Sequence, residues 1–193
     1  MARSDIKALI QELFAAAAAF KKSRGYPAPK LYPGASAAEI EAAEKKRKIK
    51  FPGTFTEFLG LHNGFDGFWG DYSLIGVKGE HTKKALAFIK MLVEIDTDER
   101  ELSSERAIKK YESEGEFYLP NYPIVGTDFG SSIILFNPRK TRPDGEMEVV
   151  FWSPEGSPFT RYGSFAEMIQ AAIVDQKRRA KTGPGRTGKG HEQ

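Results

Sequence analysis

The side chains best suited to acid–base chemistry are few and poorly placed for it. The chain has three histidines and no cysteine, so thiol mechanisms are excluded. His62 falls on the apolar face of a predicted helix, His81 lies beside a turn, and His191 lies in a basic C-terminal stretch. Histidine is the usual general acid or base at neutral pH, but nothing places His81 near His62 or near a pair of carboxylates. Metal-ligating residues do not cluster at a defined spacing either, so we predict no metal site and no cofactor.

Three aspartates are the remaining candidates for hydrolytic chemistry. Asp66, Asp71 and Asp128 lie among glycines and aromatic residues, where they could line an acidic cleft and act with His81. Aspartates in such turns more often accept hydrogen bonds from their own backbone. The sequence Gly130-Ser131-Ser132 precedes a predicted strand, whereas a nucleophilic serine of the elbow type follows one. We therefore predict that the protein is not an enzyme, with a hydrolase as the alternative.

The segment Phe65–Tyr72 has the composition of a protein-binding surface. Four aromatic residues are interleaved there with glycine and aspartate in what reads as a short loop. Exposed aromatic rings beside carboxylates are typical of interfaces, although these rings could also fold back into the core. We expect a division in which some rings are buried while Asp66, Trp69 and Asp71 stay near the surface. The predicted partner-binding residues are Asp66, Phe68, Trp69, Asp71, Tyr72 and Asp128.

Positive charge is concentrated at the C-terminus. Residues 175–193 hold six of the 29 basic residues and two of the 26 acidic ones, so residues 1–174 carry 23 basic against 24 acidic residues. A body without excess positive charge does not favour nucleic acid, apart from weak contacts of the basic tail. No stretch approaches the ~18–20 apolar residues of a membrane span. We therefore expect a cytoplasmic protein with no membrane partner.

The N-terminal part of the chain has the apolar spacing and the capping signals of three helices. The predicted helices span residues 4–24, 36–48 and 52–64, with an extended proline-rich connector at 26–34. Ser4 is the expected N-cap of the first helix, and Ser36 with Glu39 forms a capping box for the second. Pro52 is expected at the first position of the third helix, and Asn63-Gly64 is expected to close that helix as a left-handed C-cap.

The second half of the chain changes to strand patterns. The predicted strands span residues 73–77, 118–125, 132–137, 147–153 and 158–162. Between the first two, residues 82–95 fit a helix or a strand at 91–95, and residues 96–101 read as a loop. Ser103 or Ser104 then caps a short helix, and a capping box at Ser164–Glu167 opens a closing helix. Short turns between successive strands favour antiparallel pairing.

These elements predict an α+β fold, with N-terminal helices packed on a mostly antiparallel sheet and a closing C-terminal helix. We expect residues 1–31 to form a helix and a proline-rich connector, and residues 32–176 to form the α+β domain. Residues 177–193 are expected to be a disordered basic tail, because their Gly/Pro/Lys-rich sequence has nothing to pack.

Several of these motifs resemble, in order, the signature of the SUKH superfamily. The resemblance covers about residues 32–173 and rests on 33–40, Glu44, 51–52, 55, 58–59, 62–64, 123–128, 133–137, 149–152 and 164–169. The positions that it marks as structural are Pro52, Phe55, Phe58, Leu59, Asn63, Gly64 and Gly126. The superfamily takes in Smi/Knr-type cell-wall regulators of fungi and many bacterial immunity proteins.

The resemblance implies a non-enzymatic module that binds another protein. Its bacterial members look like immunity proteins that cover the active site of a cognate toxin, commonly a nuclease, and we expect the same here. The alternative is an intracellular regulatory adapter of the Smi/Knr type, linked to cell-wall synthesis or signalling. A charged insert at about residues 78–116 departs from the family pattern. Its residues 94–116 carry nine acids against four bases, which would suit a basic nuclease cleft.

Overall fold

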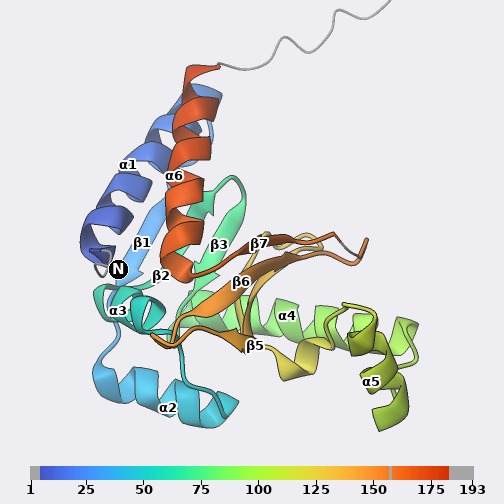
Figure 1. The fold of residues 1–193 in the computed structure, drawn as a ribbon. Helices are drawn as coiled ribbons and strands as arrows, with labels where there is room; N and C mark the ends of the chain where they lie inside the picture. The colour runs from blue at the N-terminus through green and yellow to red at the C-terminus, as the bar shows by residue number, and fades with distance from the viewer. Residues whose placement is uncertain (1–4, 157, 183–193) are drawn as a thin grey trace, which may run out of the picture.

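Residues 5–156 and 158–182 are described by the computed structural model, and over them the chain forms six α-helices, one short 3₁₀ helix and seven strands. In chain order the elements are α1 (Ile6–Arg24), β1 (Lys30–Pro33), α2 (Ala37–Arg47), α3 (Gly53–Leu61), β2 (His62–Trp69), β3 (Tyr72–Ile75), α4 (Glu80–Glu99), α5 (Glu105–Ser113), η1 (Leu119–Asn121), β4 (Ile124–Thr127), β5 (Ile133–Thr141), β6 (Met147–Trp152), β7 (Thr160–Tyr162) and α6 (Phe165–Lys181). Figure 1 shows helices flanking a single sheet, so the predicted α+β class is confirmed. None of the described helices is both long enough and apolar enough to cross a bilayer.

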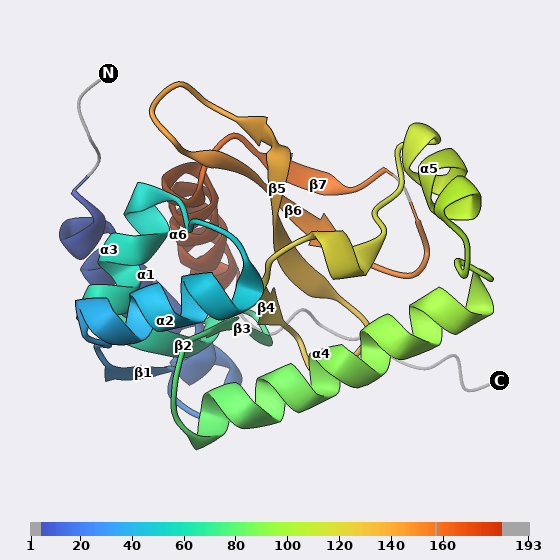
Figure 2. The same cartoon turned by 90° about the horizontal axis from the view of Figure 1, so that it is seen from below.

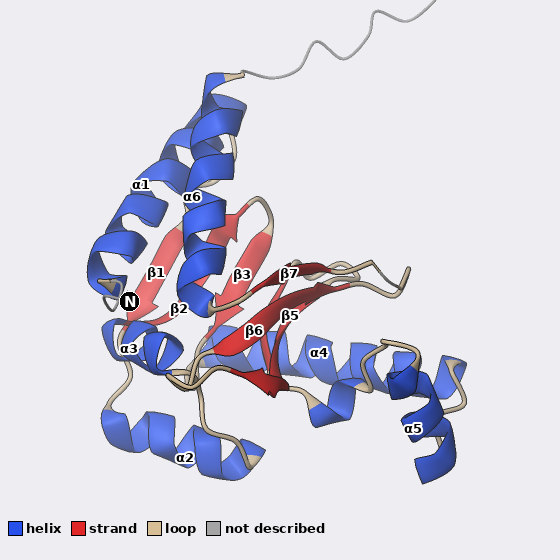
Figure 3. Cartoon of the chain, viewed as in Figure 1, coloured by secondary structure: helices blue, strands red, loops and turns tan. Residues whose placement is uncertain are grey.

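The seven strands form one open sheet whose spatial order, β1 to β7, is also their order in the chain. Every neighbouring pair is antiparallel. The β1–β2 connection holds α2 and α3, and the β3–β4 connection holds α4, α5 and η1. At Gly126 of β4, a Cβ atom would lie only 3.0 Å from the carbonyl oxygen of Ser73 and 2.9 Å from Cδ1 of Ile134, which explains the glycine. Figure 3 shows α1 and α6 side by side on one face of the sheet and α4 on the other.

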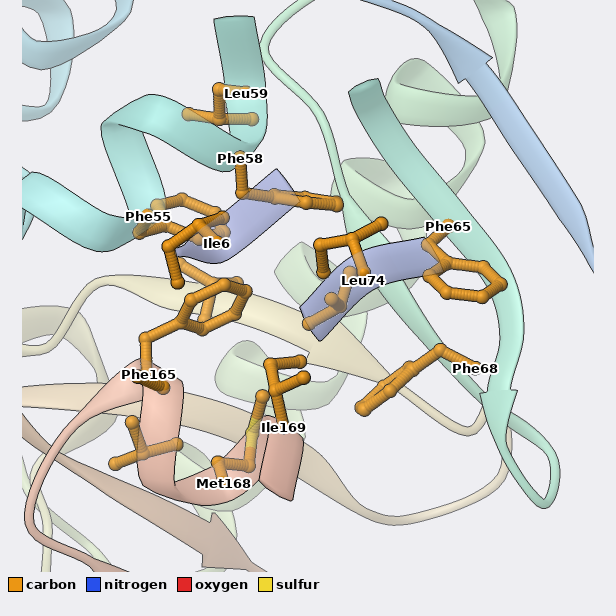
Figure 4. Packing of buried hydrophobic residues seen from close by; sticks show 14 of the residues in the cluster. Ile6, Phe55, Phe58, Leu59, Phe65, Phe68, Leu74, Phe165, Met168 and Ile169 are labelled. Atoms are coloured by element: carbon orange, nitrogen blue, oxygen red, sulfur yellow. The ribbon is translucent and has the colours of Figure 1, made fainter. Parts of the chain in front are cut away.

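The larger core lies between the sheet and helices α1, α3 and α6. Figure 4 shows the rings of Phe55 and Phe58, from α3, close to Phe165 of α6. The ring centroid of Phe55 lies 5.2 Å from that of Phe165 and 5.2 Å from that of Phe136 on β5. Helix α1 adds to this core Ile6, Ile10 and Leu13. Because fully burying such a side chain is worth ~1.5–3 kcal/mol, α1 is an integral part of the folded unit.

The smaller core lies on the opposite face, against α4 and η1. Successive residues of a strand point to opposite faces of a sheet. Phe136 and Val149 therefore belong to the larger core, whereas their chain neighbours Leu135 and Val150 belong to the smaller one. The residues that α4 buries are Thr82, Ala85, Ile89 and Asp96.

The first two helices begin much as predicted. At α2, the Ser36 hydroxyl accepts from the Glu39 backbone N–H while the Glu39 carboxylate accepts from the Ser36 N–H, so the capping box is confirmed. At α1 the N-cap is Asp5, whose carboxylate accepts from the Ala8 N–H at 3.0 Å. The predicted N-cap of α1, Ser4, lies outside the described residues.

A side chain from a distant part of the sequence caps the start of α3. Pro52 occupies the N-cap, one position before the predicted one, and provides no side-chain cap. Glu146, in the turn between β5 and β6, accepts instead from the Thr54 N–H at 2.9 Å and from the Thr54 hydroxyl at 2.6 Å. Both carboxylate oxygens are thus used to satisfy the first turn of the helix, where backbone N–H groups have no partner within the helix.

The predicted C-cap of α3 is wrong. The helix ends at Leu61, His62 has an extended backbone, and Asn63-Gly64 lie in β2. The side chain of Asn63 accepts from the Val77 N–H at 2.6 Å and donates to the Lys78 carbonyl at 2.8 Å. Asn63 therefore holds the loop between β3 and α4, a long-range role that the local Asn-Gly signal does not reveal.

Three further predictions are corrected by the structure. Residues 65–72 are not an irregular loop, because β2 and β3 form a hairpin that turns at Gly70-Asp71. Residues 82–95 are helical, and the loop predicted at 96–101 is wrong because α4 continues to Glu99. The strand predicted at 118–125 is a 3₁₀ helix followed by the start of β4.

The predicted segment boundaries also change. The boundary after residue 31 falls inside β1, and α6 continues to Lys181, so residues 177–181 are helical rather than part of a tail. The remainder of the predicted tail, from residue 183, lies outside the described residues. At the start of α6, Ser164 accepts from the Glu167 N–H as predicted, but the Glu167 carboxylate accepts from Gly163 instead of completing the capping box.

Candidate functional site

A hollow of about 420 Å³ opens on the sheet face that carries α6, between the β2–β3 hairpin and strands β6 and β7. We call it the aromatic hollow. Its lining residues are Trp69, Gly70, Asp71, Tyr72, Asp128, Phe151, Thr160, Tyr162 and Arg179. The hollow therefore brings together four of the six predicted partner-binding residues, which come from both sides of the long β3–β4 connection.

Four half-buried aromatic rings form the floor of the aromatic hollow. The Phe151 ring centroid lies 5.0 Å from that of Tyr72, 5.4 Å from that of Trp69 and 5.9 Å from that of Tyr162, all edge to face. Tyr72 is on β3 and Phe151 is on β6, three strands further across the sheet. Since neighbouring strands lie ~4.8 Å apart, the two rings meet only because the sheet is strongly curled. Figure 1 shows the β2–β3 hairpin steeply inclined to β6 and β7.

An ionised carboxylate on α6 fixes the tryptophan of the aromatic hollow. The Trp69 indole N–H donates to Asp175 Oδ2 at 2.8 Å. The Asp175 carboxylate also forms ion pairs with the guanidinium groups of Arg178 and Arg179, each with an N–O distance of 2.7 Å. Burial tends to raise the pKa of Asp175, but the hydrogen bonds from Arg178 and Trp69, together with the charge and hydrogen bond of Arg179, outweigh it and hold that pKa below its ordinary value. The indole is thereby held to α6 in a set orientation.

Two aspartates at the rim of the aromatic hollow have different roles. The side chain of Asp71 is 85% exposed, and its carboxylate lies 3.3 Å from the ammonium of Lys21, whose side chain is only 9% exposed. The Asp128 Oδ1 accepts from the backbone N–H groups of Gly130 at 2.8 Å and Ser132 at 3.0 Å. Asp128 thus shapes the β4–β5 turn, which is the turn role that its sequence context favours.

Phe68 is wrong as a partner-binding residue. It is fully buried in the larger core, with its ring centroid 6.1 Å from that of Phe65. Its carbonyl accepts from the buried side chain of Gln176 on α6 at 3.0 Å. The division expected for this segment is nevertheless confirmed, since Phe65 and Phe68 are buried while Trp69 and both hairpin aspartates are at least partly exposed.

Sequence reasoning missed the contribution of β6 and β7 to the aromatic hollow. The missed residues are Phe151, Thr160, Tyr162 and Arg179. Strand alternation could have predicted the side of the sheet on which Phe151 lies. Its neighbours Val150 and Trp152 are buried on the α4 face, so the Phe151 side chain points to the opposite face. Strand β3 approaches β6 because the sheet is curved, and no local sequence pattern predicts that curvature.

The last predicted binding residue, Asp66, faces a second hollow of about 710 Å³ between strands β1 to β3 and the start of α4. We call it the polar hollow. The Tyr32 hydroxyl donates to the Asp66 carboxylate, and the Tyr32 ring stacks on the imidazole of His81 with centroids 3.6 Å apart. The Lys30 ammonium lies 4.6 Å from the Tyr32 ring centroid. Burial and the contact with Asp66 raise the pKa of Tyr32 to about 12.

His81 is held as a structural group in the polar hollow. Its Nε2 lies 2.7 Å from the carbonyl oxygen of Asn63 and 3.2 Å from the Thr82 hydroxyl. That hydroxyl is buried and donates to the Lys78 carbonyl at 2.6 Å, so it is not presented as a nucleophile. A Cβ atom at Gly64 would lie 2.9 Å from His81 Nε2, and Gly64 has a positive φ of 117°. Glycine is therefore required for the imidazole to pack here.

The two hollows separate the groups that the hydrolase alternative would need together. Asp71 and Asp128 line the aromatic hollow, whereas Asp66 and His81 line the polar hollow. Tyr32 lies between Asp66 and His81, so these two side chains form no acid–base pair. Within residues 5–156 and 158–182, no three His, Asp or Glu side chains are grouped to hold a metal ion. The described residues therefore do not assemble the acid–base pair that the hydrolase alternative requires.

Comparison with protein families identifies the fold. The model of the SMI1/KNR4 family (SUKH-1) matches residues 34–171. The chain belongs to this family. The predicted resemblance is therefore confirmed, while a search of curated proteins found no match.

The SMI1/KNR4 family is associated with immunity proteins, its domains are generally non-catalytic, and membership implies a protein-binding role. The matched range contains all four rings of the aromatic hollow. Lys30 and Tyr32 of the polar hollow lie before that range. Of the two hollows, the aromatic one is thus the better candidate for a function shared with the family.

Proposed function

We propose that this protein is an immunity protein that binds a cognate toxin, in a one-to-one complex, through the aromatic hollow. The observation that carries the proposal is the cluster of Trp69, Tyr72, Phe151 and Tyr162 in a concave surface within the family region. Half-buried tryptophan and tyrosine rings of this kind are typical hot spots, because they offer a large contact area at little cost in conformational entropy.

The rim of the aromatic hollow supports a partner that presents a cationic side chain. Asp71 is 85% exposed and its pair with Lys21 uses only Oδ1, and the turn hydrogen bonds of Asp128 likewise go to only one of its carboxylate oxygens. A lysine or arginine inserted between these aspartates would meet carboxylate oxygens and the faces of aromatic rings, and both attract cations. Enzymes that act on nucleic acid carry such side chains in their clefts, so a nuclease-type toxin is the proposed partner.

The acidic stretch at residues 94–116 is a weaker candidate for the docking surface than its composition indicates. Five of its nine carboxylates pair with lysine or arginine within 4.0 Å, namely those of Glu94, Asp96, Glu105, Glu112 and Glu114. These pairs reduce the negative potential that an external basic cleft would meet. We therefore assign toxin binding to the aromatic hollow.

A substitution at the rim tests this assignment without removing any buried group. Thr160 is exposed on the edge strand β7 and lines the aromatic hollow. In Thr160→Lys, the added side chain would occupy the hollow and repel a cationic partner. When the chain is co-expressed with the product of the neighbouring gene, we expect the wild type to form a one-to-one complex and to restore growth. Thr160→Lys should bind at least about tenfold more weakly, a loss of ~1.4 kcal/mol.

Thr141→Lys provides the matched control. Thr141 is also exposed and lies on a strand, but outside the lining of the aromatic hollow. This variant should bind and protect like the wild type. If Thr160→Lys binds as tightly as Thr141→Lys, the aromatic hollow is not the docking surface. If the neighbouring product is harmless and forms no complex, the immunity proposal fails and the Smi/Knr-type adapter becomes the leading function.

A further inference from the structure

One side of α4 leaves apolar side chains in contact with solvent. Figure 2 shows α4 at the periphery of the molecule, with a long side that no other element covers. Met91 is 48% exposed and Ile95 is 47% exposed. Phe88 is half-buried, and its ring centroid lies 5.7 Å from that of Phe129, which is itself 48% exposed at the β4–β5 turn. Together these four side chains form a contiguous apolar patch.

Five residues along this side of α4 follow a regular spacing with a charge at each end. Lys84, Phe88, Met91, Ile95 and Asp98 recur at alternating intervals of four and three residues. This is the spacing of the contact positions in helices that pack along their length. The stripe is therefore apolar at its centre, basic toward the N-terminus of α4 and acidic toward its C-terminus.

The charges at the two ends of the stripe have no partners among the described residues. Lys84 and Asp98 are exposed, and neither forms an ion pair in this part of the chain. Other charges on α4 do pair within the helix, such as Lys83 with Glu80 and Lys90 with Glu94. The stripe thus keeps its charges available for an external partner, while Glu80, Lys83, Lys90, Glu94 and Asp96 elsewhere on the same helix are paired.

We propose that the chain forms a homodimer through this stripe, with two α4 helices running antiparallel about a two-fold axis near Met91. Lys84 and Asp98 are each seven residues from Met91. In the antiparallel pair, Lys84 of each copy therefore faces Asp98 of the other, while the apolar centres meet. A second copy is the indicated partner because the stripe, when it runs in the opposite direction, presents an acidic end to a basic end. A two-fold symmetric interface requires such self-complementarity.

The proposed dimer is weak and compatible with toxin binding. The stripe spans 84–98, or ~21 Å at 1.5 Å per residue. Two such helices bury less than the ~1,200–2,000 Å² of a stable interface, so association should depend strongly on concentration. The stripe is on the helix that covers the smaller core, whereas the aromatic hollow lies on the opposite face of the sheet. Both surfaces can be occupied together, and the dimer does not depend on the proposed function.

Charge exchange in the purified full chain tests the symmetry directly. Sedimentation velocity over about 10 μM to 1 mM should show the wild type rising from the mass of one chain toward that of two. Lys84→Glu alone and Asp98→Lys alone each place like charges opposite one another, and each should weaken dimerisation at least fivefold. The double variant Lys84→Glu/Asp98→Lys should recover wild-type association. Lys84→Glu places a negative charge near the N-terminus of α4, and Asp98→Lys places a positive charge near its C-terminus. Both changes are favourable for the helix dipole, so weaker dimerisation could not be attributed to unfolding of the helix.

A second pair of variants tests the apolar centre. Met91→Glu should abolish the dimer, whereas Val174→Glu, at an exposed apolar position on α6, should not affect it. Circular dichroism would verify that both variants fold. A wild type that stays monomeric throughout the concentration range would overturn the proposal. So would a double charge variant that associates no better than either single variant, or a dimer that survives Met91→Glu.

Discussion

The two faces of the sheet are packed in different ways. On one face, α6 buries seven of its 17 residues against α1, α3 and the strands. On the other face, α4 buries only four of its 20 residues, and α5 buries none. The first face has the interlocking rings of Phe55, Phe58 and Phe165, whereas α4 keeps Met91 and Ile95 in solvent. We infer that the first face supplies most of the stability, and that the second provides surface for interaction.

The largest effect that this difference predicts is for Phe55→Ala. Phe55 is 1% exposed and contacts four other rings, so the substitution leaves a large cavity and should cost ~3–5 kcal/mol of unfolding free energy. Ile89→Ala on α4, which is 6% exposed at the margin of the smaller core, should cost only ~2 kcal/mol. Urea denaturation followed by tryptophan fluorescence measures both. Equal losses would show that the two faces contribute alike.

A smaller effect is expected for the carboxylate that caps α3. Glu146→Gln should cost ~1–3 kcal/mol, because an amide cannot accept from both the backbone N–H and the hydroxyl of Thr54 as a carboxylate does. Glu155→Gln, at an exposed position, is the matched control and should be neutral. The same denaturation assay applies. A Glu146→Gln variant as stable as the control would show that the cap contributes nothing to the first face.

Local patterns predicted the first face well, because its helices carry their own signals. The apolar spacing in α1, the capping box of α2 and the apolar side of α6 are each read from consecutive residues. The opposite face was harder to predict. Residues 91–95 are apolar except for Glu94 and partly β-branched, which suits strand or helix, and the mostly acidic residues 96–99 resemble a loop. In the structure these residues continue α4, whose Ile89 packs in the smaller core against strands far along the chain, a non-local contact.

The candidate site was predictable only in part, for a related physical reason. Trp69 and Tyr72 were found because aromatic residues crowd one short segment. Phe151 and Tyr162 join them only through sheet curvature, which arises from strand pairing across the whole chain. Phe68 was misplaced because composition cannot tell which rings of a hairpin face the core. That choice depends on strand register, and the β2–β3 register shifts between Phe65 and Trp69.

Hydrogen exchange should resolve the two faces at the level of individual helices. Because few residues of α4 and none of α5 are buried, local opening there should require less free energy than opening of α1 or α6. We expect the amides of α5 and the C-terminal half of α4 to exchange about tenfold or more faster than those at the centre of α6, a difference of ~1.4 kcal/mol. Mass spectrometry of peptides after timed labelling would measure this. Uniform protection would argue for a single cooperative unit that includes the α4 face.

The smallest predicted effect is a loss of stability in acid from an exposed contact between α2 and the loop that leads to α4. The hydrogen bond from Lys78, aided by the Ser36 N–H, lowers the pKa of Glu39 to about 2. The unfolded chain protonates this carboxyl near its ordinary value of 4.5, so the unfolded state binds more protons between these limits. The contribution of Glu39 is therefore complete above pH 4.5 and is lost as the pH falls toward 2. Glu39→Gln should flatten the decline of the thermal midpoint over that range, whereas Glu41→Gln, an exposed neighbour on the same helix, should leave the slope of the wild type unchanged.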